Sequence, residues 1–229
     1  MLSAIAIVPS APVLIPELAG AAAAEIADLT AAVVEAAAAL PPRWIAIGTG
    51  AADAVLDPDA GGTFAGFGAD VRVGLSPHAL VQEPVPLPLC ALIAAWVRGR
   101  ARPDASAQVR VYAGDRAPDT ALALGRRLRA EIEREADPVG VLVVADGANT
   151  LTPPAPGGFD PANAEAQQAL DDALADGDLA ALTALPAPIL GRVAFQVLAG
   201  LTEPGPRSAK EFYRGAPYGV GYFAGAWQP

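Results

Sequence analysis

The chain has 229 residues, a formal net charge of −10 and a sequence pI near 4.5. An acidic chain with a single lysine, Lys210, does not suit binding to the phosphate backbone, so we expect no nucleic-acid partner. Mean hydropathy is +0.35, yet no stretch of about 18 residues lacks both charge and proline, so we expect no membrane-spanning helix. One cysteine, Cys90, permits no intrachain disulfide, and a soluble cytoplasmic protein is the simplest expectation.

In the N-terminal region, prolines mark the boundaries of the first predicted elements. Leu2–Val8 is a short, largely apolar segment closed by Pro9, which is typical of a strand buried on both faces. Pro16 and Glu17 then open an alanine-rich segment that predicts one helix reaching about Leu40.

The rest of the chain continues the alternation of strands and helices. Further strands are predicted at Arg43–Thr49, Asp70–Val73, Gln108–Ala113, Val139–Ala145 and Tyr218–Trp227. Further helices are predicted at about Pro86–Arg98, Pro118–Ala136, Asp160–Leu185 with a break at Gly177, and Ile189–Leu201. This order predicts an α/β fold with a mostly parallel central sheet flanked by helices, in a single domain spanning residues 1–229.

Two segments are predicted to be irregular. Asp57–Gly68 is dense in Gly, Asp and Pro, and its Gly61–Gly68 part lacks the Lys-Ser/Thr of a phosphate-binding loop. Asp146–Pro161 is longer than a loop that only connects two elements of a compact domain usually is. Because it follows a predicted parallel strand, it falls where open α/β sheets place their ligands, and we expect it to be the functional surface.

The scarcity of metal ligands limits the chemistry. The only histidine is His78, whereas a mononuclear iron oxygenase site needs two imidazoles and a carboxylate. A zinc site within a single chain would need both His78 and Cys90, which flank a proline-rich stretch. We therefore expect no metal, and we expect Cys90 to be an inert core residue.

Several scattered pieces of the chain resemble the class III extradiol ring-cleavage dioxygenases, in particular the LigB-like family of the protocatechuate 4,5-dioxygenase beta chain. Val143–Thr152 (VVADGANTLT) is similar to the family's Gly-Asp-Leu-Ser-His segment, and Asp146 matches its aspartate. Tyr218–Tyr222 (YGVGY) resembles the terminal Gly-Val-Gly-Tyr strand of that family. The remaining pieces are the turns at Ile7–Pro12 and Trp44–Gly50, the helical region around Phe159-Asp160 and Gly177-Asp178, and Ile189-Leu190-Gly191.

The functional residues of the family are replaced in this chain. The resemblance implies an Fe(II) site, but Ser10 and Gly50 stand at the two ligand histidines and Ile189 at the ligand glutamate. Asn149 falls where the acid/base histidine sits. The resemblance therefore predicts a LigB-like scaffold that has lost iron-dependent ring cleavage, with no cofactor and no assigned catalytic residue.

Polar residues after the predicted strands suggest what the scaffold retains. Ser10, Asp146, Asn149 and Thr150 would gather with Gly50 at one edge of a parallel sheet, forming a vestigial pocket that binds a small molecule. Equally, Ser, Asn and Asp after strands are often turn residues and helix caps.

Three functional alternatives follow. The first is a small-molecule-binding or interaction protein without catalysis. The second is metal-free chemistry with Asp146 as base, oriented by Ser10 and Asn149. The third is a metal site completed between protomers through a neighbour's His78, and the sequence leaves open whether the family's tendency to form homo-oligomers persists.

Overall fold

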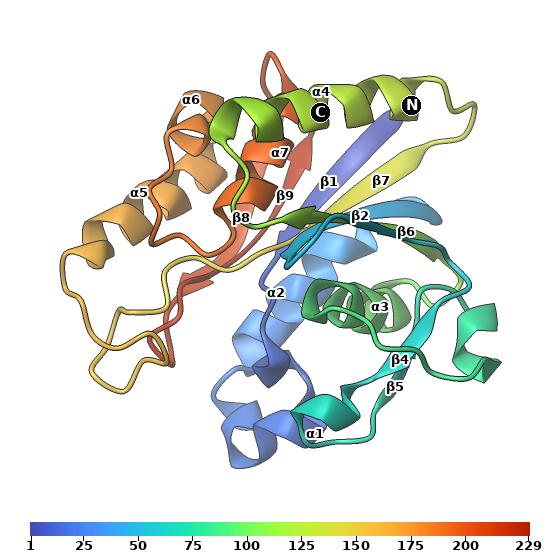
Figure 1. Ribbon diagram of the computed structural model, residues 1–229, viewed down its shortest axis with the longest axis horizontal. Coiled ribbons are helices and arrows are strands. Elements are labelled where there is room, and N and C mark those ends of the chain that lie inside the picture. Colours follow the sequence, from blue (N-terminus) through green and yellow to red (C-terminus); the bar gives the residue numbers. More distant parts are fainter.

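The computed structural model describes all residues from Met1 to Pro229 and is built on a seven-stranded sheet of order β3-β6-β2-β7-β1-β9-β8 (Figure 1). The strands of this sheet are β1 (Leu2–Val8), β2 (Arg43–Gly50), β3 (Ala54–Leu56), β6 (Ser106–Ala113), β7 (Val139–Val144), β8 (Ser208–Gly215) and β9 (Tyr222–Gln228). A separate two-stranded sheet pairs β4 (Gly61–Thr63) with β5 (Arg72–Gly74).

The centre of the large sheet is parallel and its margins are antiparallel. Strands β6, β2, β7 and β1 run in one direction, whereas β3 on one side and β9 on the other run against them. The outermost strand, β8, is antiparallel to β9. The four predicted parallel strands are confirmed. Strands β3 and β8 were not predicted, because they are edge strands whose residues carry no clear core-facing apolar pattern.

Helices cover both faces of the sheet. They are α1 (Pro16–Ala19), α2 (Ala27–Ala38), α3 (Leu89–Ala101), α4 (Pro118–Glu133), α5 (Asn163–Asp176), α6 (Leu179–Thr183) and α7 (Arg192–Thr202). Figure 1 shows α2 and α3 on one face and α4 with α7 on the other. None of these helices is long and apolar enough to cross a membrane.

Strand β1 shows why two cores form. Its Ala4, Ala6 and Val8 pack into the cluster with α2 and α3, while Ile5 and Ile7 pack into the cluster with α4 and α7. Successive side chains of a strand point to opposite faces, so a strand covered by helices on both sides is apolar throughout. The near-continuous apolar runs of the parallel strands therefore follow from their central place.

Two predicted helices differ from the observed ones. The helix expected from Pro16 to Leu40 is interrupted at Gly20, whose φ of 55° is outside the helical region. A 3-10 turn (Gly20–Ala24) and then α2 follow instead. The helix expected from Pro86 begins at Leu89, because Pro88 has extended backbone angles.

Further differences concern segments held by tertiary contacts. The segment Asp57–Gly68, expected to be a loop, contains β4 and a 3-10 turn. The helix expected from Ile189 begins at Arg192, because Ile189 forms a bridge with Ala148 and Gly191 donates to Asp146. The break at Gly177 is confirmed, with a φ of 72° between α5 and α6.

Candidate functional site

Ser10 and Asp146 meet at the carboxyl edge of the parallel strands. Val8 of β1 lies opposite Val144 of β7, so the residues two positions farther on come side by side. The backbone N–H of Ser10 donates to Oδ1 of Asp146 over 2.8 Å. Ile47 of β2 lies opposite Val143, which puts Gly50 at the same edge. The predicted convergence of Ser10, Gly50 and Asp146 on one edge is thus confirmed.

The carboxyl group of Asp146 is held on one oxygen and open on the other. Its Oδ2 accepts no hydrogen bond from the protein and is not fully buried. Burial raises the pKa of Asp146 from the usual 3.8 to about 7, against the lowering effect of the Ser10 hydrogen bond. This carboxyl can therefore donate or accept a proton near neutral pH.

Tyr222 is the residue of this region that the sequence reasoning missed. It is the first residue of β9 and only 5% exposed; its hydroxyl makes no hydrogen bond within the protein and is not fully buried. Burial raises the pKa of Tyr222, and the nearby Asp146 carboxylate raises it further. The signal lay in the segment Tyr218–Tyr222, which returns the chain beside β1. We refer to Ser10, Asp146 and Tyr222 as the Asp146 site.

Backbone hydrogen bonds fix the frame around this site. Gly191 donates to the carbonyl of Asp146 over 2.8 Å. Gly147 donates to the carbonyl of Gly221, and Gly221 donates to that of Ala148, each over 2.8 Å. A Cβ at Gly191 would lie 2.5 Å from the Cβ of Ala145, so only glycine allows this approach. The position of the Asp146 carboxyl is set by backbone contacts on both sides.

Asn149 and Thr150 make contacts within the Asp146–Pro161 loop and with the start of α5. The carbonyl of Asn149 accepts from Gly157 over 2.9 Å, and Oγ1 of Thr150 accepts from Nδ2 of Asn163 over 2.8 Å. No hydrogen bond joins either side chain to Asp146. These contacts order the loop rather than extend the Asp146 site.

A buried amide ties the same loop to α5. Oε1 of Gln167 accepts from the N–H of Ala148, and its Nε2 donates to Oδ1 of Asp171, both over 2.8 Å. Gln167 and Asp171 are 7% and 8% exposed. Burial raises the pKa of Asp171 to about 6. The N–H of Ala148 and the buried amide of Gln167 thus both find partners, as buried polar groups require.

The residues that the resemblance places at iron-ligand positions do not fit a metal. Ser10 and Gly50 bring no imidazole to the edge, and Ile189 is a hydrocarbon side chain only 1% exposed. No three His, Cys, Asp or Glu side chains converge in a metal-binding arrangement.

His78 and Cys90 stand apart from one another. His78 is exposed on a 3-10 turn (His78–Val81), with its Nε2 2.9 Å from Nε2 of Gln82. Cys90 is buried in the first turn of α3 against Gly48, and burial raises the pKa of its thiol to about 11. A thiol this deeply protonated is a core residue rather than a nucleophile.

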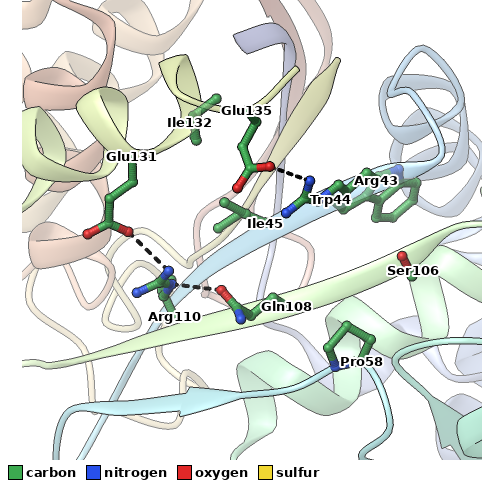
Figure 2. A pocket seen from close by; sticks show the side chains of 10 residues that line it. All are labelled: Arg43, Trp44, Ile45, Pro58, Ser106, Gln108, Arg110, Glu131, Ile132 and Glu135. Carbon is green, nitrogen blue, oxygen red and sulfur yellow. Dashed lines mark hydrogen bonds and ion pairs between the residues drawn. The ribbon is translucent and has the colours of Figure 1, made fainter. Parts of the chain in front are cut away.

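The main cavities of the molecule lie away from the Asp146 site. None of the five is lined by Ser10, Asp146 or Tyr222. One, of about 390 Å³, opens at the amino ends of β2 and β6 beneath α4 (Figure 2). None of these cavities therefore reaches the carboxyl edge at Asp146.

Comparison with known proteins shows the fold and no more. No family model matches the sequence, and no curated protein is significantly similar to it. The structure resembles that of the uncharacterized protein JW3007 from Escherichia coli K12, with a TM-score of 0.60 and 10% sequence identity. The similarity covers 98% of this chain and 99% of the other.

Proposed function

We propose that this chain is a LigB-like protein without iron-dependent ring cleavage that binds a small molecule at the Asp146 site. The observation that carries the proposal is the carboxyl of Asp146, which is desolvated yet keeps Oδ2 free of protein partners. Burying a carboxyl without a full set of partners is unfavourable, and such arrangements cluster at functional sites.

The chemistry of the site selects the kind of ligand. Asp146 offers an acceptor, and Tyr222 offers a hydroxyl without a protein partner. A small molecule that carries a hydroxyl or amine donor satisfies Asp146 and accepts or donates at Tyr222. The proposal that iron is absent rests on the count of imidazoles, since one histidine cannot supply two ligands.

A second candidate is metal-free acid–base chemistry at the same place. It is favoured by the pKa of Asp146 near 7, the range in which a general base works best at neutral pH. In that role Asp146 takes a proton from the bound molecule, while the Ser10 N–H holds the carboxyl in place.

A third candidate is an interaction protein. It is favoured by two exposed apolar side chains, Phe159 in the Asp146–Pro161 loop at 52% and Leu190 at 49% exposure. The N–H of Leu190 donates to the carbonyl of Gly147, which fixes this residue against the loop.

The experiment combines ligand binding with an iron control. Purified protein is screened by ligand-observed NMR against small phenols, catechols and amines, protocatechuate included, and then incubated with Fe(II), oxygen and protocatechuate. We expect at least one bound compound, loss of its binding in Asp146→Asn, and no ring-opened product. Asp115→Asn, an exposed aspartate after β6, is the matched control and should keep binding.

Two results would overturn the proposal. One is stoichiometric Fe(II) binding with ring opening. The other is a screen in which every binder is retained by Asp146→Asn, which would assign binding to another part of the molecule.

A further inference from the structure

A groove at the amino ends of β2 and β6 carries a second constellation of charged groups (Figure 2). On the face below α4, β6 presents Ser106, Gln108 and Arg110 where the neighbouring β2 presents Ile45 and Ile47. Polar side chains give the helix no apolar surface to pack on, so α4 does not close over β6. A cavity of about 390 Å³ remains between them.

This cavity continues into a second one across a single ion pair. Arg110 and Glu131 line both, and the second cavity measures about 340 Å³. Its apolar wall includes Val55, Leu124 and Leu128. The Arg110–Glu131 pair therefore lies between the two cavities, and each cavity has an apolar surface beside the pair.

The ion pair leaves donors and acceptors free. Nη2 of Arg110 lies 3.1 Å from Oε2 of Glu131, and its Nε donates to Oε1 of Gln108 over 3.1 Å. Nη1 of Arg110 and Oε1 of Glu131 have no hydrogen-bond partner in the protein. The two side chains keep 26% and 36% of their surface, so water screens them only in part.

A second pair closes the other end of the first cavity. Nη1 of Arg43 lies 2.6 Å from Oε2 of Glu135, and Figure 2 shows Ile45 and Ile132 between the two pairs. The two arginines and two glutamates balance in charge. A polyanion would meet both carboxylates and a polycation both guanidinium groups, so neither matches the groove.

We propose that the two cavities beside the Arg110–Glu131 pair together bind a free α-amino acid with an apolar side chain. An α-amino acid carries a carboxylate and an ammonium on one carbon, which matches a guanidinium and a carboxylate held side by side. The ligand carboxylate takes the free N–H groups of Arg110, its ammonium takes Oε1 of Glu131, and its side chain lies on Leu124 and Leu128. The proposal is independent of the Asp146 site.

The first arm of the test uses L-leucine and two molecules that each lack one charge. Calorimetric titration should show saturable binding of L-leucine. 4-Methylpentanoate lacks the ammonium and 3-methylbutylamine lacks the carboxylate, so each should bind at least about tenfold more weakly. No saturation by about 10 mM L-leucine, or equal affinity for either analogue, would overturn the proposal.

The second arm uses charge-removing variants. Arg110→Gln and Glu131→Gln should each lower the affinity for L-leucine at least about tenfold, because a charge-assisted hydrogen bond is lost. Arg126→Gln, which breaks the exposed pair with Glu203 outside the groove, should leave it unchanged. Circular dichroism checks folding, and the Glu131 variant decides if the Arg110 variant does not fold. Unchanged affinity in a folded Arg110→Gln or Glu131→Gln protein would contradict the proposal.

Discussion

The two ends of the same parallel strands are built differently. At the carboxyl end, the N–H of Ser10 donates to one desolvated carboxyl, that of Asp146, and the N–H groups of Gly191 and Gly221 donate to the backbone carbonyls of Asp146 and Ala148. At the amino end, side-chain ion pairs line an open cavity, and Arg43 keeps 49% of its surface. The carboxyl end therefore depends on backbone hydrogen bonds and presents one reactive group, the Asp146 carboxyl. The amino end is exposed to solvent, and its charges are shared between two ion pairs. Mutations should affect stability strongly at the first end and weakly at the second.

The largest effect is expected in the strand that supports the carboxyl end. Val143 of β7 is fully buried, so Val143→Asp would place an unpaired charge in the core. We expect a loss of more than about 4 kcal/mol, enough to unfold a typical domain. Urea denaturation or the circular dichroism spectrum at room temperature measures it. A folded variant with near-normal stability would show that the sheet is not the support described above.

A smaller but distinct loss is expected at Gly191. In Gly191→Ala the new Cβ would lie 2.5 Å from the Cβ of Ala145 and 2.8 Å from the carbonyl oxygen of Asp146. Overpacking of this kind costs about 1–3 kcal/mol. Gly99→Ala in α3 is the control, because no atom lies within 4 Å of its new Cβ, and it should be neutral or stabilising by about 0.5–1 kcal/mol. Equal effects in chemical denaturation would remove the distinction between the two glycines.

The smallest effect is expected at the amino end. Arg43→Gln removes the pair with Glu135, whose side chains keep 49% and 40% of their surface. Exposed pairs contribute about 0–1 kcal/mol, so the melting temperature should hardly change. A loss comparable to that of Gly191→Ala would mean that the ion pairs hold the amino end together, contrary to the comparison.

Much of the parallel part of the sheet could be predicted from the sequence, because the central strands are apolar in composition and are also buried in the fold. Leu2–Val8 and Val139–Val144 are short and apolar on both faces, a pattern typical of strands covered by helices on both sides. The edge strand β8 was not predicted, since its residues contact water on one side and β9 on the other. Its pairing with β9 depends on tertiary contacts, which a local sequence pattern does not indicate.

The candidate sites divide in the same way. Asp146 was predicted from its place after a buried strand, and Ser10 from its place after the neighbouring one. Tyr222 was missed because its approach to Asp146 depends on the turn that returns β9 beside β1. The groove at Arg110 and Glu131 was missed because it forms between a strand and the helix that follows it, where neither segment alone indicates a gap.

The central claim, that Asp146 is a functional carboxyl held at a cost to stability, is tested by the pH dependence of unfolding. The folded-state pKa of about 7 lies above the usual 3.8, so the folded protein binds the proton more tightly. The free energy of unfolding should therefore fall as pH rises from about 4 to 7, by a few kcal/mol at most. Asp171 shifts in the same direction, but it is present in both proteins when the wild type is compared with Asp146→Asn.

The decisive measurement is the free energy of unfolding of Asp146→Asn and of the wild type, determined by urea denaturation at about pH 4 and about pH 8, on either side of the shifted pKa. We expect the variant to lose less stability than the wild type between these pH values and to be at least as stable at the higher one, because its neutral amide avoids the desolvated charge. If Asp146→Asn is instead several kcal/mol less stable than the wild type at the higher pH, Asp146 is a structural cap for the Ser10 turn and the central claim is wrong.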